Sequence, residues 1–273
     1  MNERPRQDGA KLRLNRFLAD AGVASRRDAE AIVAAGQVTV NGHAVDSPGT
    51  LVDPGRDAVK ILGRRVRPQA NIYLLLHKPE GILSTVDDPQ HRRTVLDCLP
   101  DLGARVYPVG RLDGNTSGAL LLTNDGELAL RLTHPRYGFE RTYHAKVNDV
   151  PSEGDLRRLA QGVNIPAPPG RFVKTLPARV RLLRRWEKNA LLEITLREGR
   201  HHQVRKMCAA VGHPVIKLTR VAFGFLTLAG LPPGRWRRLS PREVERLRRC
   251  EGTPARPRPR RTPPARGRGR RRP

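Results

Sequence analysis

Residues 106–110 and 118–123 are two short apolar runs on either side of a glycine-rich polar loop, and no other pattern in the chain limits the fold more. Apolar runs of this length, bounded by turn residues, are typical of buried β-strands. Residues 141–147 alternate between apolar and polar side chains, which predicts a half-buried strand. Further strands are expected at residues 73–76, 178–183 and 190–196.

Helices are expected between these strands, where capping residues precede an apolar period of three to four. They cover residues 125–133, 152–162 and 204–211. The last expected helix has the fullest signature, with Ser240 as N-cap, Pro241 at the first helical position and Glu243 at the third. Strands mixed irregularly with helices predict an α+β sheet domain.

A small separate module is expected at residues 10–57. Leu14, Phe17, Leu18 and Ala21 recur at helical spacing, and a second helix follows an N-cap serine at position 25. Alternating residues around Asn41-Gly42 then predict a β-hairpin. Two short helices and a hairpin bury little surface, so this module is small.

The remaining boundaries follow from composition. We expect a linker at residues 58–70, with a strand near Val59, and a larger domain at 71–252. Residues 1–9 are polar without periodicity, and residues 253–273 are rich in Arg, Pro and Gly. Because neither segment can form a core, both are expected to be disordered.

The chain carries 52 Lys and Arg against 26 Asp and Glu, a net charge of +26. Residues 253–273 hold nine Arg and no acid, which leaves 26 − 9 = +17 on the preceding 252 residues. The main part of the chain is therefore basic even without this segment. Such an excess predicts a polyanionic partner, either nucleic acid or an acidic membrane surface.

Composition also argues against several classes of protein. No apolar run approaches the 18 or more residues of a membrane helix, and the first twenty residues contain no apolar secretory segment. The three cysteines are far apart and form no CxxC pair, so neither structural zinc nor a disulfide framework is expected. The expected compartment is the reducing cytoplasm.

Three features could carry chemistry. Asp113 lies in the loop between two buried strands, although the carboxylate of an ordinary turn would also fit there. Residues 198–207 place basic groups at the start of a helix, which suits an anion or merely a solvated face. Tyr143 could serve a site or fill the core.

Three segments together resemble a known family. The string GRLDGNTSGALLLTNDGELALRLTHPRYGFERTYHAKV resembles the catalytic motif region of RNA pseudouridine synthases. LHKPEGILST and EGRHHQVRKMCAAVGHP resemble the family's first and third motifs, and the module at about 10–57 resembles an S4 RNA-binding domain. The resemblance covers Lys11 to Leu247 and is stronger towards synthases that act on large-subunit ribosomal RNA. It implies a mixed, mostly antiparallel sheet flanked by helices.

The resemblance implies a role for each candidate. Asp113 matches the family's essential aspartate, Arg205 the arginine that pairs with it, and Tyr143 the tyrosine that stacks on the base. The reaction breaks the N1–C1′ bond of a uridine, turns the uracil and joins C5 to C1′. This is an isomerisation without redox change or group donor, so the resemblance implies no cofactor and no metal. Direct attack of Asp113 on C1′ and proton removal to a glycal-like intermediate both remain open.

Other basic residues are expected to contact RNA. Arg111 matches the position that fills the base stack when the uridine flips out, and Lys78 and Arg200 lie in the neighbouring motifs. In the S4-like module, the arginines on the first two helices either bind structured RNA or form a solvated face: Arg13, Arg16, Arg26 and Arg27.

The expected function is conversion of a uridine to pseudouridine in 23S ribosomal RNA by a cytoplasmic monomer. The partner is ribosomal RNA or a ribosomal assembly intermediate, with no membrane. The alternatives are a non-catalytic S4 RNA-binding assembly factor and a synthase that acts on 16S ribosomal RNA or tRNA.

Overall fold

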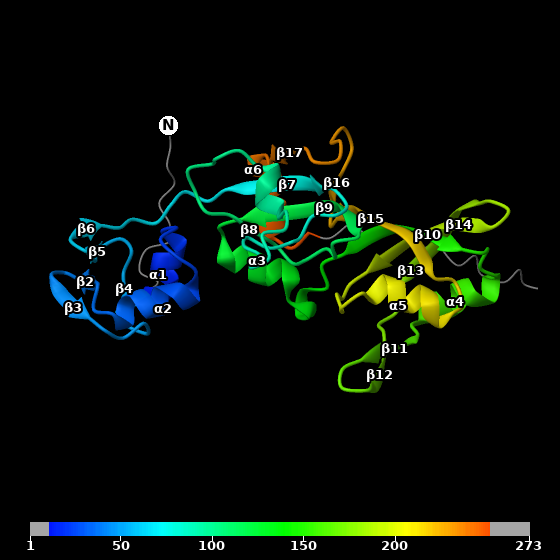
Figure 1. Cartoon of the computed structure of the whole chain (residues 1–273), viewed down its shortest axis with the longest axis horizontal. Helices are drawn as coiled ribbons and strands as arrows, with labels where there is room; N and C mark the ends of the chain where they lie inside the picture. Colours follow the sequence, from blue (N-terminus) through cyan, green and yellow to red (C-terminus); the bar gives the residue numbers. More distant parts are fainter. Residues whose placement is uncertain (1–10, 252–273) are drawn as a thin grey trace, which may run out of the picture.

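The computed structural model describes residues 11–251, and the expectations for residues 1–9 and 253–273 lie outside this range. It shows an N-terminal unit at one end of the long axis and a larger sheet domain beyond it (Figure 1). No helix within residues 11–251 is long and apolar enough to cross a membrane.

The N-terminal unit packs two helices on short strands. Its elements are β1 (Leu12–Arg13), α1 (Leu14–Asp20), α2 (Arg26–Ala34), β2 (Val38–Val40), β3 (His43–Val45), β4 (Leu51–Val52), β5 (Val59–Ile61) and β6 (Arg64–Arg65). Ser25 and Asp28 form the expected capping box at the start of α2. Asn41 and Gly42 both have positive φ, as a two-residue hairpin turn requires.

The expected linker at 58–70 differs from the structure. β5 pairs with β2, and β6 pairs with β5, so the first half of this segment completes the N-terminal sheet. Val59 is fully buried in the core of the unit because it faces the helices. The structural unit therefore extends to Val66, which packs against the same core, and the residues after it connect the unit to the larger domain.

The larger domain is built on one mixed sheet. Its strands are β7 (Tyr73–Lys78), β8 (Tyr107–Pro108), β9 (Thr116–Thr123), β10 (Arg141–Asn148), β13 (Arg179–Arg185), β14 (Asn189–Leu196), β15 (Val215–Phe223), β16 (Leu226–Thr227) and β17 (Trp236–Arg238). The main order is β13-β14-β10-β15-β9-β7-β17, and all pairs are antiparallel except β15 with β9. The structure confirms the expected α+β fold with a mostly antiparallel sheet.

The helices cover parts of this sheet. They are α3 (Gly126–Thr133), α4 (Glu153–Gln161), α5 (Gln203–Ala210) and α6 (Pro241–Arg248), with 3₁₀ turns η1 (Val95–Cys98) and η2 (Pro135–Tyr137). A hairpin of β11 (Asn164–Ala167) and β12 (Arg171–Lys174) projects from the domain (Figure 1). Neither this hairpin nor β15 is among the elements predicted from the sequence.

Three apolar clusters hold the sheet domain together. One packs α4 and α5 against β10, β14 and β15. The other two lie on opposite faces of β7 and β9, so that Leu75 and Leu121 face one cluster and Leu74 and Leu120 the other. Burial on both faces explains why these two strands are continuous apolar runs, and it fixes the end of β9 from which the loop with Asp113 emerges.

Candidate active site

Asp113 lies in the loop between β8 and β9, and its side chain is 31% exposed. The preceding residue, Leu112, is buried, and the Ser84 side chain holds both of its backbone groups. The Leu112 carbonyl accepts from the Ser84 hydroxyl at 2.8 Å, and the Leu112 N–H donates to the Ser84 hydroxyl oxygen at 3.1 Å. The Thr116 N–H donates to the Asp113 carbonyl at 3.0 Å. The loop therefore presents an accessible carboxylate on a fixed backbone.

Lys78 is fully buried beneath this loop, so the expected RNA contact is wrong. Its ammonium donates to the carbonyl oxygens of Pro79 (3.0 Å), Asp113 (3.3 Å), Gly114 (3.4 Å) and Thr116 (3.0 Å). Burial lowers the pKa of Lys78 to about 8, although nearby Cys98, Asp113 and Glu80 oppose this shift. Lys78 holds the backbone of the candidate catalytic loop.

Arg205 does not pair with Asp113, which contradicts the expected ion pair. From the first turn of α5, its guanidinium donates to the carbonyl oxygens of Asn115 at 2.8 Å and Val215 at 3.3 Å. Its Nε is buried without a hydrogen-bond partner among the described residues. Arg205 thus joins α5 and β15 to the loop two residues after Asp113.

The side chain that does reach the carboxylate is that of His202, which is not among the site residues predicted from the sequence. Its Nε2 lies 3.3 Å from Asp113 Oδ1. His202 is the N-cap residue of α5, in the left-handed conformation at φ 54°. The only sequence signal for it is its place in the basic segment at the start of α5.

Tyr143 is half-buried on β10 and packs against the apolar cluster that contains Leu112. It lies opposite Arg220 of β15, which in turn lies opposite Gly118 of β9. This register places Tyr143 two strands away from the end of β9 where the candidate loop begins. The two sequence motifs that contain Asp113 and Tyr143 therefore meet on one sheet.

The remaining expected RNA contacts divide into two groups. Arg111, Arg13 and Arg27 are exposed, and Arg200 is exposed but pairs with Glu198 at 3.0 Å. Arg26 is also exposed, whereas Arg16 is partly exposed and lies against the sheet domain. Arg16 pairs with Asp20 and with Glu127 of α3, each at 3.6 Å, and Arg26 lies beside Gly126 at the start of that helix.

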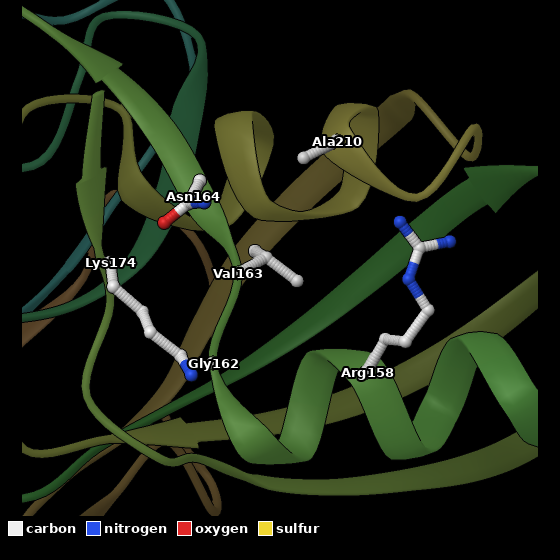
Figure 2. A pocket seen from close by; sticks show the side chains of 6 residues that line it. All are labelled: Arg158, Gly162, Val163, Asn164, Lys174 and Ala210. Atoms are coloured by element: carbon white, nitrogen blue, oxygen red, sulfur yellow. The ribbon is translucent and has the colours of Figure 1, made fainter. Parts of the chain in front are cut away.

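A cavity of about 380 Å³ lies elsewhere, between α4, β11 and the C-terminal end of α5 (Figure 2). It is lined by Arg158, Gly162, Val163, Asn164, Lys174 and Ala210. None of the expected catalytic residues lines it. Within residues 11–251, no group of three or more His, Cys, Asp or Glu side chains is arranged to hold a metal ion.

Comparisons with known proteins agree with this architecture. The family described as RNA pseudouridylate synthase matches residues 72–210, and the S4 domain family matches residues 12–57. The chain is 44% identical over 238 residues to the ribosomal large subunit pseudouridine synthase B of Bacillus subtilis (strain 168), covering 86% of this chain and 95% of that protein.

Two further matches cover most of the chain. An uncharacterized RNA pseudouridine synthase of Aquifex aeolicus (strain VF5) is 43% identical over 252 residues, covering 92% of this chain and 99% of the other. A solved structure described as "Crystal structure of pseudouridylate synthase" superposes with a TM-score of 0.62 and 30% identity, covering 86% of this chain and 99% of that one. With an S4 domain in front of its sheet domain, the chain belongs to the RNA pseudouridylate synthase family of enzymes.

Proposed function

We propose that this enzyme converts a uridine of large-subunit (23S) ribosomal RNA into pseudouridine, with Asp113 as the catalytic carboxylate. The similarity to the Bacillus subtilis large-subunit synthase, which spans 95% of that protein, supports this choice of substrate. The observation that carries the role of Asp113 is its loop, where a buried ammonium fixes the backbone while the carboxylate stays accessible. The proposal includes a cytoplasmic location, since ribosomal RNA is the substrate.

The proposed reaction starts with a uridine outside the RNA stack. Flipping costs a few kcal/mol, and contacts of exposed arginines with flanking phosphates offset it. Arg111, which is exposed and two residues before Asp113, would occupy the vacated stack. Tyr143 would then stack on the uracil and help to take the C5 proton.

Asp113 then acts at the sugar. Its carboxylate either attacks C1′ directly or removes a proton to give a glycal-like intermediate, while the electrons of the N1–C1′ bond leave with the uracil. After the base turns, C5 bonds to C1′ as the Asp113–C1′ bond breaks on the first route, or as the glycal carbon regains its proton from Asp113 on the second. C5 then loses its proton and N1 gains one. The product has the same atoms as the substrate, so the proposed reaction needs no group donor.

The test is tritium release from RNA labelled at uridine C5, with 23S ribosomal RNA, 16S ribosomal RNA and tRNA as separate substrates. We expect release from 23S RNA by the native protein, none by Asp113→Asn, and RNA binding by both. Asp87→Asn is the matched control, because it makes the same change at an exposed carboxylate.

Each of the other outcomes would contradict a different part of the proposal. Release from 16S RNA or tRNA alone would contradict the substrate. Binding of ribosomal RNA without release by the native protein would favour an S4-containing assembly factor. Release by Asp113→Asn at the native rate would contradict the role of Asp113.

A further inference from the structure

Within residues 11–251, His202 is the one basic side chain that reaches the Asp113 carboxylate, and the two form an ion pair when the imidazole is protonated. The imidazole Nε2 lies 3.3 Å from Oδ1, with the two side chains 44% and 31% exposed. The other carboxylate oxygen, Oδ2, makes no hydrogen bond or ion pair in the same part of the chain. The contact therefore orients the carboxylate through one oxygen and leaves the other for a substrate.

We infer that His202 is a positioning residue for Asp113. The Nε2 of His202 donates to Oδ1 of Asp113 and holds the carboxylate in its reacting orientation. The inference rests on the proposed catalytic role of Asp113. It assigns to His202 the contact that the family resemblance assigns to Arg205. Arg205 instead binds the carbonyl of Asn115, so that one residue holds the carboxylate and the other holds the backbone beside it.

The backbone around His202 supports this role. A left-handed conformation is uncommon for a residue other than glycine, and it persists only where the surroundings impose it. Here Gln203 donates its side-chain amide to buried Glu198 at 2.7 Å, and its Oε1 accepts from the Arg200 N–H at 2.9 Å. These bonds close the turn on both sides of His202 and direct it towards the loop.

The imidazole is also held from the side. The ring of His201 stacks on that of His202, with centroids 3.8 Å apart and planes 23° apart. Stacking restricts rotation of the His202 ring and so reduces the entropy that its bond to Asp113 must overcome. The turn, the stack and the contact thus act on the same side chain.

The test uses the full chain and three substitutions of His202. Gln places an amide donor near the position of Nε2, and Leu has no donor. Asn has an amide donor that is too short to reach Asp113, but it suits the left-handed backbone. We expect His202→Leu and His202→Asn to lower kcat on 23S RNA about 10- to 100-fold, the loss of one hydrogen bond to a charged group. KM should stay within about twofold, and His202→Gln should keep kcat within about threefold of native.

His91 provides the matched control. It is exposed, has the same left-handed backbone at φ 53°, and makes no hydrogen bond or ion pair with Asp113 within the described range. His91→Leu should therefore leave kcat unchanged. His202→Asn keeps the test valid even if His202→Leu does not fold, because Asn adopts this conformation readily.

Three results would overturn the inference. Native kcat in His202→Asn would show that the contact does not matter, and equal losses in the Gln and Asn variants would show that a donor does not replace the imidazole. A change in KM alone would make His202 an RNA contact. Turnover by the native enzyme separates these results from failure of the proposed function, since a native protein without turnover on any RNA would overturn both.

Discussion

Replacing Lys78 with methionine keeps the length of the side chain and removes its ammonium group. Lys78 is fully buried and donates to four carbonyl oxygens, three of them in or beside the loop that carries Asp113. We expect Lys78→Met to lower both stability and kcat while leaving RNA affinity intact. The affinity is unaffected because a fully buried side chain cannot reach RNA.

The size of the stability loss follows from the contacts. Two of the four carbonyl oxygens, those of Asp113 and Gly114, also accept backbone N–H groups and keep a partner in the variant. The other two, of Pro79 and Thr116, lose bonds of 3.0 Å each. At about 1.5–3 kcal/mol for each bond to a charged group, the loss is about 3–6 kcal/mol.

Removing the buried charge offsets part of this loss. Burial lowers the pKa of Lys78 to about 8, which corresponds to about 1–3 kcal/mol once solvent screening is allowed for. The net loss in the free energy of unfolding is then about 0–5 kcal/mol, and its central value of about 2–3 kcal/mol corresponds to about 4–12 °C in Tm for a domain of this size. Urea denaturation and thermal melting of the full chain measure it.

The effect on turnover should be larger than the effect on stability. A displacement of about 1 Å in a reacting group costs about 100-fold in rate, so kcat of Lys78→Met should fall to about that extent. Single-turnover tritium release and filter binding separate rate from affinity. A variant with native kcat and RNA binding weakened more than tenfold would refute the reasoning and restore Lys78 as an RNA contact.

The pH dependence of stability and turnover provides a second test of the contacts that Lys78 makes with the loop. The pKa of Lys78 is about 8 in the folded chain, below its ordinary value of 10.5, so the unfolded chain binds more protons between these two pH values. This group alone therefore makes the free energy of unfolding rise with pH in that window. Turnover should fall over the same window, as the ammonium loses its charge and one donor. Lys78→Met should show neither Lys78-dependent change.

Three further predictions test the surroundings of the loop. Gly118→Ala should lower the free energy of unfolding by more than about 3 kcal/mol, because φ is +126° and a Cβ would collide with the backbone of β15. Gly199 has open space around it, so Gly199→Ala should change the free energy of unfolding by less than about 1 kcal/mol in the same urea titration, and equal effects of the two substitutions would contradict this packing. Arg205→Met should lower kcat about 100-fold with RNA affinity within twofold, whereas a loss confined to affinity in filter binding would contradict its role on the loop backbone. Arg13→Ala should reduce the slope of log K against log salt by about one, and Arg16→Ala should leave it unchanged because its guanidinium is already paired; equal slopes would show that both bind phosphate.

The elements that the sequence predicts correctly are those whose signals are local. Ser25, Ser152 and Ser240 each form a capping box with the residue three positions later, and each starts a helix where expected. Asn41-Gly42 forms the expected hairpin turn. In these cases the partners lie within three or four residues, so the pattern contains the whole interaction.

The central strand β15 escapes prediction because its pattern depends on distant residues. It carries Arg220 in its middle, only 2% exposed, where a pattern-based reading expects an apolar side chain. The strand can lie there because Gly118 of β9 has no side chain against the Arg220 backbone, and because Arg220 Nε donates to the Ala119 carbonyl at 2.7 Å. These contacts join residues about 100 positions apart.

The roles of the site residues also depend on contacts between distant parts of the chain. The sequence predicts Lys78 and Arg16 as RNA contacts and Arg205 as the partner of Asp113, but a basic residue offers no local sign of which acceptor it binds. Lys78 reaches carbonyls 35 to 38 residues ahead, Arg205 reaches back 90 residues, and Arg16 pairs with Glu127 of the other domain. The identity of the residues is readable from the chain, but their roles follow from the fold.

Lys78, which is buried, and Arg205, which is partly buried, act on backbone carbonyls and not on the carboxylate. Lys78 binds the Asp113 carbonyl, and Arg205 binds the Asn115 carbonyl. A guanidinium fixed against the carboxylate would neutralise its charge and occupy its oxygens, which a nucleophile or base needs for the sugar. Holding the loop through its backbone gives the same rigidity without that cost, and a half-exposed imidazole on one oxygen completes the orientation. On the proposed role of Asp113, the excess of positive charge around this loop therefore positions the carboxylate while its second oxygen stays available for reaction.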